Sequence, residues 1–271
     1  MGTSVNVKGV KFGEKDPLAL IAGPCVIESR EGCMAIADRL VKLAKEQNIP
    51  LVFKASYDKA NRTSINSYRG PGIEKGLEIL AEIKAKYDIP VLTDVHSVEE
   101  IKIAAQTVDI IQLPAFMIRQ TDFVVAAGES GAVVNVKKAQ FAAPWDMKNV
   151  VKKIESTGNR NILLTERGAS FGYNTLVADM RSLIIMREFG YPVIFDATHS
   201  VQSPGGQGDT SGGDGRFAPY LAKAAAAVGV DGMFIETHPN PAEALSDGPN
   251  MIPTRDLSSL WKKLDAIDRI K

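Results

Sequence analysis

Residues 51–94, LVFKASYDKANRTSINSYRGPGIEKGLEILAEIKAKYDIPVLTD, join two short apolar runs through a polar segment and an amphipathic one. The runs LVFK (51–54) and VLTD (91–94) are typical of buried strands. Between them, Glu74 to Tyr87 places its apolar residues mostly at helical spacing. This order of strand, helix and strand predicts one unit of a parallel α/β fold.

The same unit recurs along the whole chain. Six further apolar runs are LALIA (18–22), IIQL (110–113), VVNV (133–136), ILLT (162–165), VIFD (193–196) and GMFIE (232–236). Helical patterns fill the connections, among them Gly32 to Glu46, Trp145 to Ser156, Arg181 to Glu188 and, last, Asp256 to Ile270. Eight alternations without a change in composition predict a closed (β/α)8 TIM barrel, with an open eight-stranded sheet as the alternative. We expect residues 1–271 to form a single domain, with residues 1–15 as a short N-terminal extension.

Composition excludes several classes of protein. Lys and Arg number 32, and so do Asp and Glu, so there is no overall charge to attract nucleic acid or an anionic membrane. The first fifteen residues lack the apolar core of a signal peptide, and no stretch approaches the ~20 apolar residues that span a bilayer. We therefore expect a cytoplasmic protein with no nucleic-acid or membrane partner.

Cationic residues follow several of the predicted strands. Active sites of (β/α)8 barrels are built at the carboxyl ends of the strands, so the residues just after each strand are the ones to examine. The basic residues there are Lys54, Lys59, Arg62, Arg119, Lys137, Lys138 and Arg167. In a chain without net charge, this concentration predicts a site for two small phosphorylated molecules rather than ordinary solvated surface charge.

A thiol, an imidazole and two carboxylates fall on the same rim. Cys25 follows the first predicted strand, His199 follows the seventh, and Glu236 ends the eighth, with Asp247 in the next connection. Because these strands are neighbours in a closed barrel, we expect the four side chains to converge on a divalent ion such as Zn, Fe or Mn. The spacing is not local, so a buried thiol with solvated acids is the alternative.

Two histidines and one loop have less specific interpretations. His96 and His238 also follow strands, and we interpret them as hydrogen-bonded loop residues. The segment from Ser203 to Arg216, SPGGQGDTSGGDGR, contains six glycines and predicts a loop without regular structure. Its position between a strand and a helix favours a lid over a linker.

Nine stretches together resemble one family over nearly the whole chain. They are IAGPCVIES (21–29), FKASYDKANRTS (53–64), RGPG (69–72), TDVHS (93–97), IQLPAFMIRQTD (111–122), VNVKKAQF (134–141), LTERGASFGYN (164–174), DATHSVQSPGG (196–206) and ETHPNPAEALSDGPNM (236–251). The chain thereby resembles the 3-deoxy-D-manno-octulosonate 8-phosphate synthases, relatives of the 3-deoxy-D-arabino-heptulosonate 7-phosphate synthases. The segment KANRTS (59–64) favours the first group, because the second usually has a Lys-Pro-Arg-Thr pattern there.

The resemblance implies a reaction and a set of substrate contacts. The reaction is the condensation of phosphoenolpyruvate with D-arabinose 5-phosphate and water, a step of lipopolysaccharide biosynthesis; erythrose 4-phosphate is the aldose of the alternative, heptulosonate-forming enzyme. The residues implied to hold or adjoin phosphoenolpyruvate are Lys54, Lys59, Gln112, Ala115, Lys137 and Arg167, and those implied to hold arabinose 5-phosphate are Asn61, Arg62 and Ser64. Arg119 is implied to reach a neighbouring subunit's site in a homotetramer, with Phe116, Met117 and Ile118 at the interface.

The first motif separates the family by metal use. Members that need no metal carry Asn where this chain has Cys25, so the thiol implies the metal-dependent branch, with Cys25, His199, Glu236 and Asp247 as ligands. The candidate catalytic residues are Lys59, Lys137, Arg167, His199 and, for proton movement, Asp94. Cys33 matches no functional position and is interpreted as a packed thiol.

Two other classes of function remain open from the residues. A Schiff-base aldolase would use Lys54, Lys137 or Lys138 as a desolvated amine. A non-catalytic phosphosugar-binding barrel would bind both ligands without releasing phosphate.

Overall fold

Eight parallel strands close into a barrel in the computed structural model, which describes residues 2–205 and 212–270. Closure is complete because β11 pairs with both β8 and β14. In order around the barrel the strands are β3 (Ala19–Gly23), β4 (Leu51–Lys54), β5 (Val91–Asp94), β6 (Ile110–Leu113), β7 (Val133–Lys137), β8 (Ile162–Glu166), β11 (Val193–Asp196) and β14 (Gly232–His238). The predicted (β/α)8 barrel is confirmed, and each of the eight predicted apolar runs forms one of its strands.

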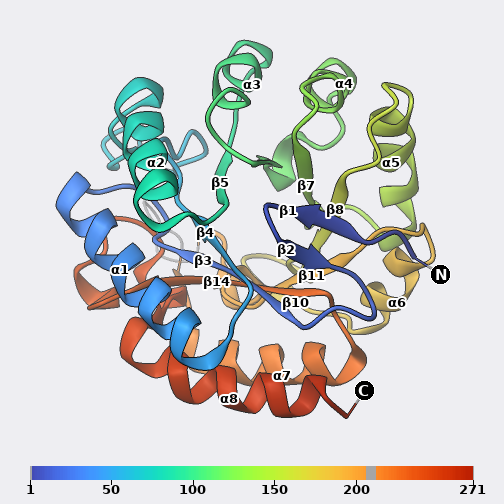
Figure 1. Ribbon diagram of the computed structural model, residues 1–271. Helices are drawn as coiled ribbons and strands as arrows, with labels where there is room; N and C mark the ends of the chain where they lie inside the picture. Colours follow the sequence, from blue (N-terminus) through green and yellow to red (C-terminus); the bar gives the residue numbers. More distant parts are fainter. Residues whose placement is uncertain (1, 206–211, 271) are drawn as a thin grey trace.

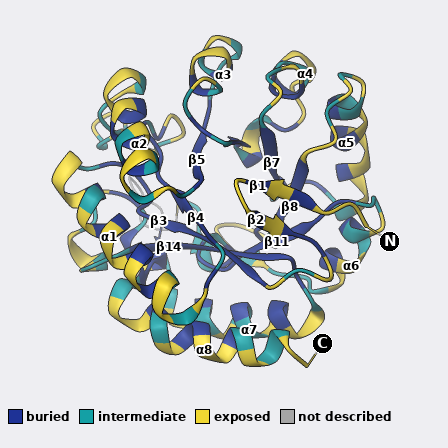
Figure 2. Ribbon diagram, viewed as in Figure 1, coloured by how far each residue is buried: buried dark blue, intermediate teal, exposed yellow. Residues whose placement is uncertain are grey.

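Among the described residues, eight α-helices surround the strands (Figure 1). They are α1 (Arg30–Gln47), α2 (Ile73–Tyr87), α3 (Val98–Ala104), α4 (Thr121–Glu129), α5 (Met147–Glu155), α6 (Arg181–Arg187), α7 (Ala218–Val228) and α8 (Leu257–Asp268). Local sequence sets their ends: the Ser29 side chain accepts a hydrogen bond from the Gly32 amide to begin α1, and Asn48 ends it in the left-handed conformation. Figure 2 shows the strands buried and the outer faces of the helices exposed.

The N-terminal extension is a hairpin that closes one end of the barrel. Strands β1 (Val5–Val7) and β2 (Val10–Phe12) pair antiparallel and bury their alternate side chains. Those side chains share an apolar cluster with barrel residues such as Ala19, Leu92 and Phe234. Most of these barrel residues lie in the first half of their strands, so the hairpin covers the amino-terminal end, nearest the viewer in Figure 1. The opposite, carboxyl-terminal end carries the connections in which a site is expected.

Short strands elaborate those connections. Strands β9 (Ala169–Ser170) and β10 (Leu176–Val177) pair after β8, β12 (Gln202–Ser203) and β13 (Gly212–Gly213) pair after β11, and β15 (Ile252–Pro253) joins the edge of β14. The predicted lid therefore has paired flanks, and its central residues 206–211 lie outside the described residues. Within residues 2–205 and 212–270, the helices are all too short or too polar to cross a lipid bilayer.

Candidate active site

A polar cavity of about 260 Å³ opens at the carboxyl ends of the barrel strands. Its polar lining is Lys59, Asn61, Asp94, His96, Gln112, Lys137, Gln140, Arg167, His199, Gln202 and Asp247. Ala115, Phe116 and Met117 add an apolar side. Three cations of the predicted ring that line this cavity are not solvated surface charges, because Lys59, Lys137 and Arg167 are all less than a tenth exposed.

A layer of hydrogen-bonded side chains supports the floor of this cavity. Asn135 on β7 donates its amide to Gln112 Oε1 at 3.0 Å and accepts from Thr165 Oγ1 at 2.6 Å. Because its oxygen is occupied, Gln112 presents its NH2 group to the cavity, where it can donate to an anion.

Lys137 ends β7 and faces two partners at the end of β11. Its ammonium contacts the Asp196 carboxylate and lies 3.4 Å from His199 Nδ1 and 3.8 Å from the Phe234 ring centroid. Burial lowers the pKa of Lys137 and outweighs the attraction of Asp196. Burial alone would raise the pKa of Asp196, but His199 and Lys137 hold it well below its usual range.

Asp196 also sets the orientation of His199. His199 Nδ1 lies 2.7 Å from Asp196 Oδ2, and the His199 amide donates to Asp196 Oδ1 at 2.9 Å. A carboxylate only accepts, so Nδ1 carries a proton, and Nε2 is the nitrogen that would offer a lone pair to a bound cation. That atom lies 3.6 Å from Glu236 Oε2, at the candidate metal centre.

A second cation, Lys59, lies on the opposite side of the cavity near Asp94. Lys59 Nζ is 3.8 Å from Asp94 Oδ2 and 3.9 Å from Glu236 Oε1. Burial acts to lower the pKa of Lys59, but Asp94, Cys25 and Glu236 raise it well above the ordinary value. Burial acts to raise the pKa of Asp94, but Lys59 and His96 lower it well below the ordinary value. Both groups are therefore charged at neutral pH.

Arg167 follows β8 directly and is held by its neighbours. Glu166 Oε1 accepts from the amides of Arg167 and Gly168, at 3.0 and 2.7 Å, which fixes the turn. The guanidinium donates through Nη2 to Gln202 Oε1 at 2.8 Å. Its Nη1 is buried and has no hydrogen-bond partner in the part of the chain that the structure describes. This leaves a donor that an anion in the cavity could satisfy.

Three of the four predicted metal ligands converge. One donor atom each from Cys25, Glu236 and Asp247 lies within 4.8 Å of the other two. Within the described residues, His199 is not part of this closely spaced group, although its Nε2 adjoins Glu236. Asp247 has a φ of 52°, a left-handed conformation that non-glycine residues seldom adopt and that often marks a functional site.

The chemistry of this donor set fits a divalent cation. Burial raises the pKa of the Cys25 thiol well above its ordinary value, and the charges of Glu236 and Asp247 raise it further. Burial acts to raise the pKa of Glu236, but Lys54, His199 and Lys59 lower it below the ordinary range. A cation among the three donors would offset the repulsion of the carboxylates and favour the thiolate, and thiolate with carboxylate suits a borderline metal.

Lys54 supports this centre from below. Its ammonium contacts Glu236 and donates to the carbonyl oxygens of Cys25, at 2.8 Å, and Pro24, at 3.3 Å. Lys54 is 1% exposed and is not among the described residues that line the cavity. Gly23 permits the backbone of Lys54 to lie close to β3, because a Cβ at position 23 would lie 1.8 Å from the Lys54 carbonyl oxygen.

The residues expected to hold the aldose are only partly brought together. Asn61 lines the cavity, and Arg62 donates through Nη1 to Ser246 Oγ at 2.6 Å, beside Cys25. The described lining of this cavity does not include Ser64, whose hydroxyl accepts from the Asn66 amide at 3.3 Å. Ala115 lines the cavity as expected.

Arg119 lies apart from the cavity of its own chain. It is exposed and borders a different hollow, with Phe141 and Lys153. Of the neighbouring apolar residues predicted at an interface, Phe116 is 53% exposed, whereas Ile118 is 1% exposed and packs in the core. The placement of Ile118 at an interface was wrong, because its side chain points into the protein's own apolar interior.

The remaining histidines and the second thiol have the partners expected of structural residues. His238 Nδ1 lies 2.8 Å from the Asn240 carbonyl oxygen. His96 is hydrogen-bonded as expected, but it also lines the cavity. Cys33 is packed in α1, and burial raises its pKa to about 12.

The sequence interpretation missed several polar residues at the site, above all Asp196, Gln140, Gln202 and Ser246. Asp196 ends the run VIFD, and a carboxylate at the carboxyl end of a barrel strand is a signal that was available. Gln140 and Ser246 lie inside irregular connections and Gln202 lies in the two-residue strand β12, and in such segments sequence spacing does not indicate the direction of a side chain.

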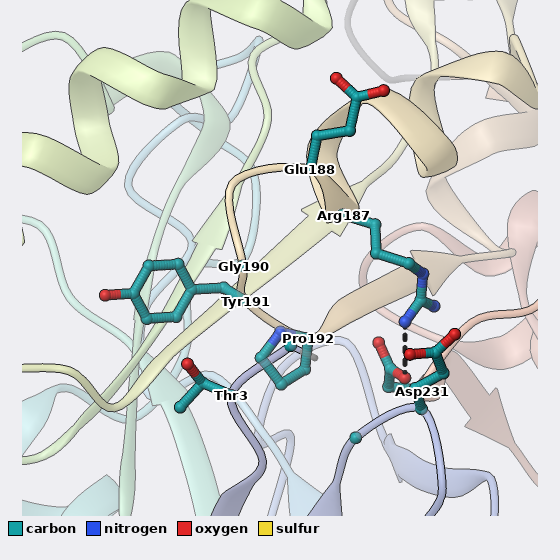
Figure 3. A pocket seen from close by; sticks show the side chains of 10 residues that line it. Thr3, Arg187, Glu188, Gly190, Tyr191, Pro192 and Asp231 are labelled. Carbon is teal, nitrogen blue, oxygen red and sulfur yellow. Dashed lines mark hydrogen bonds and ion pairs between the residues drawn. The ribbon is translucent and has the colours of Figure 1, made fainter.

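A second cavity, of about 230 Å³, lies at the amino-terminal end, bordered by residues just before and just after the hairpin and by residues that precede β11 and β14. Figure 3 shows Arg187 directed at Asp231, with which it forms an ion pair of 3.1 Å, while Glu188 points away. The Arg187 charge is thus engaged, and no buried cation ring surrounds this space among the described residues. The carboxyl-terminal cavity is the stronger candidate.

Sequence comparison identifies close relatives. The profile of the DAHP synthetase I family matches residues 3–269. The chain is 58% identical over 270 residues to the 2-dehydro-3-deoxyphosphooctonate aldolase of Geobacter metallireducens, covering 100% of this chain and 99% of the relative. It is 61% identical over 264 residues to the protein of the same name from Granulibacter bethesdensis, covering 97% and 94%.

Proposed function

Because the chain belongs to the DAHP synthetase I family, we propose that it condenses phosphoenolpyruvate with D-arabinose 5-phosphate and water, forming 3-deoxy-D-manno-octulosonate 8-phosphate and phosphate. The name of the relatives supports the choice of aldose, because it refers to an octonate, a product with eight carbons. Phosphoenolpyruvate supplies three of these carbons and a pentose supplies five. Erythrose 4-phosphate would give seven. One observation carries the proposal, namely the buried cations Lys59, Lys137 and Arg167 around one cavity at the carboxyl ends of the strands.

These cations suit the binding of phosphoenolpyruvate. Its phosphate and carboxylate need donors that do not have to be desolvated at the moment of reaction. The donors would be Lys59, Lys137, the Gln112 amide and Arg167 Nη1, which has no hydrogen-bond partner among the described residues. Holding both substrates with their reacting carbons near contact would contribute up to about 7–11 kcal/mol of the barrier reduction.

The proposed reaction requires groups in the cavity that accept and donate protons. C3 of phosphoenolpyruvate attacks the aldehyde carbon, whose oxygen takes a proton and becomes a hydroxyl. Water adds to C2 and loses one proton, which balances the proton taken by the aldehyde oxygen. The C2–O bond to phosphate then breaks, the phosphate leaves with the electron pair, and the C2 hydroxyl gives its proton to that phosphate to become the ketone. Asp94 is the candidate for proton movement, since it lines the cavity and its Oδ1 has no partner among the described residues.

Cys25, Glu236 and Asp247 would hold a divalent ion, with His199 beside them. A bound Zn, Fe or Mn would supply Lewis-acid polarisation to a water or to the aldose. The thiol, the imidazole orientation set by Asp196 and the two carboxylates support metal dependence. Asn61 and Arg62 would hold the aldose; Ser64 would join them by a change in its loop.

We also propose that residues 1–271 form one catalytic domain that acts as a homotetramer. Arg119 is exposed and is not among the described residues that line its own cavity, which supports a role at a neighbouring subunit's site. The exposed Phe116 beside it supports a contact there.

Phosphate release with the two aldoses tests the proposal. We expect kcat/KM with arabinose 5-phosphate to exceed that with erythrose 4-phosphate by about 100-fold or more, because a site that hydrogen-bonds the five-carbon sugar would leave polar groups unpaired with the four-carbon one. The measurement is inorganic phosphate released from phosphoenolpyruvate, with product mass as a second readout. A higher value with erythrose 4-phosphate would assign the chain to heptulosonate synthesis, and binding of both ligands without phosphate release would make it non-catalytic.

A further inference from the structure

Behind the cavity wall, Glu100 holds the His96 side chain and backbone. Glu100 lies in the first turn of α3, where its amide donates to Ser97 Oγ. Its Oε2 accepts from the His96 amide at 2.7 Å and from the buried Tyr57 hydroxyl at 2.8 Å, and lies 3.2 Å from His96 Nδ1. The Tyr57 ring also meets the His96 ring edge to face at 6.0 Å. The His96 ring is therefore fixed from two directions.

The other face of the His96 ring meets Asp94. His96 Nε2 lies 3.4 Å from Asp94 Oδ2, and Lys59 Nζ lies 3.8 Å from the same oxygen. The second oxygen, Oδ1, is buried and has no hydrogen-bond partner within the described ranges 2–205 and 212–270. Asp94 thus has one oxygen held by cations and one left for a water or substrate in the cavity.

We infer that Glu100 is a positioning residue of the proposed condensation: acting through His96, it keeps Asp94 Oδ2 engaged and Oδ1 directed at the substrates. The inference rests on the proposed function, because that reaction gives Asp94 a proton to move. Glu100 itself does not line the described part of the cavity. It acts by orienting the imidazole and by supplying the negative charge opposite it.

The electrostatic arrangement supports this role. His96 lies between two carboxylates that only accept, so both ring nitrogens have reason to carry protons. Burial acts to lower the pKa of His96, but Asp94 and Glu100 raise it above the ordinary value. The charged or titratable groups facing His96 and Asp94 from all packed elements are Tyr57, Asp58, Lys59, Lys54 and Glu100.

Replacing Glu100 with Gln tests the charge while keeping the shape. Gln retains an oxygen that can accept from Tyr57 and from the His96 amide, but it removes the anion that favours the imidazolium. We expect kcat near neutral pH to fall about tenfold, with the KM values of both substrates changed less than about twofold. The alkaline limb of the kcat profile should move to lower pH by about one unit, because His96 then loses its proton more easily.

Glu99→Gln is the matched control. Glu99 is exposed in the same helical turn, so this variant removes the same charge without touching His96. The chain has three histidines, so the His96 ring resonance can be assigned by comparison with His96→Asn, and its titration followed by NMR. The midpoint should fall in Glu100→Gln and stay in Glu99→Gln. In the His96→Asn background, Glu100→Gln should lower kcat no further.

The outcomes separate the inference from the function on which it rests. If the wild-type protein turns over but Glu100→Gln has the same kcat, alkaline pH limb and His96 midpoint as the wild type, the inference alone is overturned. Equal shifts in Glu99→Gln would overturn it as well. A further loss in the His96→Asn background would overturn action through His96. No turnover by the wild-type protein would remove both proposals. If Glu100→Gln does not fold, the wild-type midpoint decides: a value above about 6.5 supports the inference, and one at or below it contradicts the inference.

Discussion

A Lys137→Met variant is expected to lose about 10²- to 10³-fold in kcat/KM for phosphoenolpyruvate, the range found when one preorganised donor is removed from an active site. The Lys137 ammonium is buried, lines the cavity and is held in place by Asp196 and the Phe234 ring. Methionine keeps much of the side-chain volume but leaves the Asp196 carboxylate without its ammonium. The free energy of unfolding should therefore also fall, by about 3–5 kcal/mol.

Lys138→Met separates the two effects. Lys138 is also buried, but it lies 3.5 Å from Glu166 and within hydrogen-bond distance of the carbonyl oxygens of Ala139, Ala142 and Gly168. Its loss should destabilise the protein comparably and lower kcat/KM by no more than about tenfold. Steady-state kinetics with denaturant unfolding of both variants checks this. An equal kinetic loss in the two variants would contradict a direct role for Lys137.

The second large effect is expected at the proposed metal centre. Cys25→Ser should lower the metal content of the purified protein and reduce kcat by more than about 100-fold, since the loss of outer-shell contacts alone costs ten- to a hundredfold. Treatment with a chelator should have a similar effect on the wild-type protein. Elemental analysis gives the metal content independently of activity.

Cys33→Ser is the control for Cys25→Ser. Both thiols are buried, but Cys33 packs in α1 away from the carboxylates, so its replacement should leave metal content and kcat unchanged. Cys25→Asn is informative in another way, because it introduces the residue that the family resemblance implies for members that need no metal, and a slower, metal-independent enzyme is the result expected from that resemblance. Full activity in metal-free wild-type protein would refute the metal assignment, and unchanged metal in Cys25→Ser would remove Cys25 from the ligand set.

The barrel could be predicted because its strands are buried on both sides. A run such as LVFK or VIFD has no polar alternation, and a polar residue at its end marks where the chain leaves the apolar layer. Once closure is assumed, the carboxyl ends of all strands share one rim, so Lys137 and Glu236 could be expected there. The hairpin of residues 5–12 was not predicted, because each of its strands has only three residues.

The direction in which each side chain of the rim points could not be predicted. Lys137 and Lys138 are adjacent in sequence, yet one lines the cavity and the other faces Glu166, since Lys138, just after β7, continues the alternation in side-chain direction of the strand. Lys54 belongs to the predicted cation ring but is directed at Glu236 and two carbonyl oxygens. The position of a charged residue after a predicted strand indicates that it reaches the rim, but only the three-dimensional arrangement shows which charged residues pair with each other.

Residues in the long connections were the least predictable. The position of Ser64 depends on the path of an irregular loop, and that of Ser246 beside Cys25 on a contact between residues 221 positions apart. His199 stays a predicted metal ligand: its Nδ1 contacts Asp196, and its Nε2 lies 3.6 Å from Glu236 Oε2. Asp196 was missed because the interpretation paired the cations with substrates and not with carboxylates of the protein.

A crystal structure with phosphoenolpyruvate bound, in the absence of any aldose, tests the central claim most directly. The account predicts the phosphate and carboxylate groups of the ligand at the carboxyl-terminal cavity, within hydrogen-bond distance of Lys59, Lys137 and Arg167. Phosphoenolpyruvate bound elsewhere, such as in the amino-terminal cavity beside Arg187 or in the hollow beside Arg119, with this cavity left empty, would contradict it.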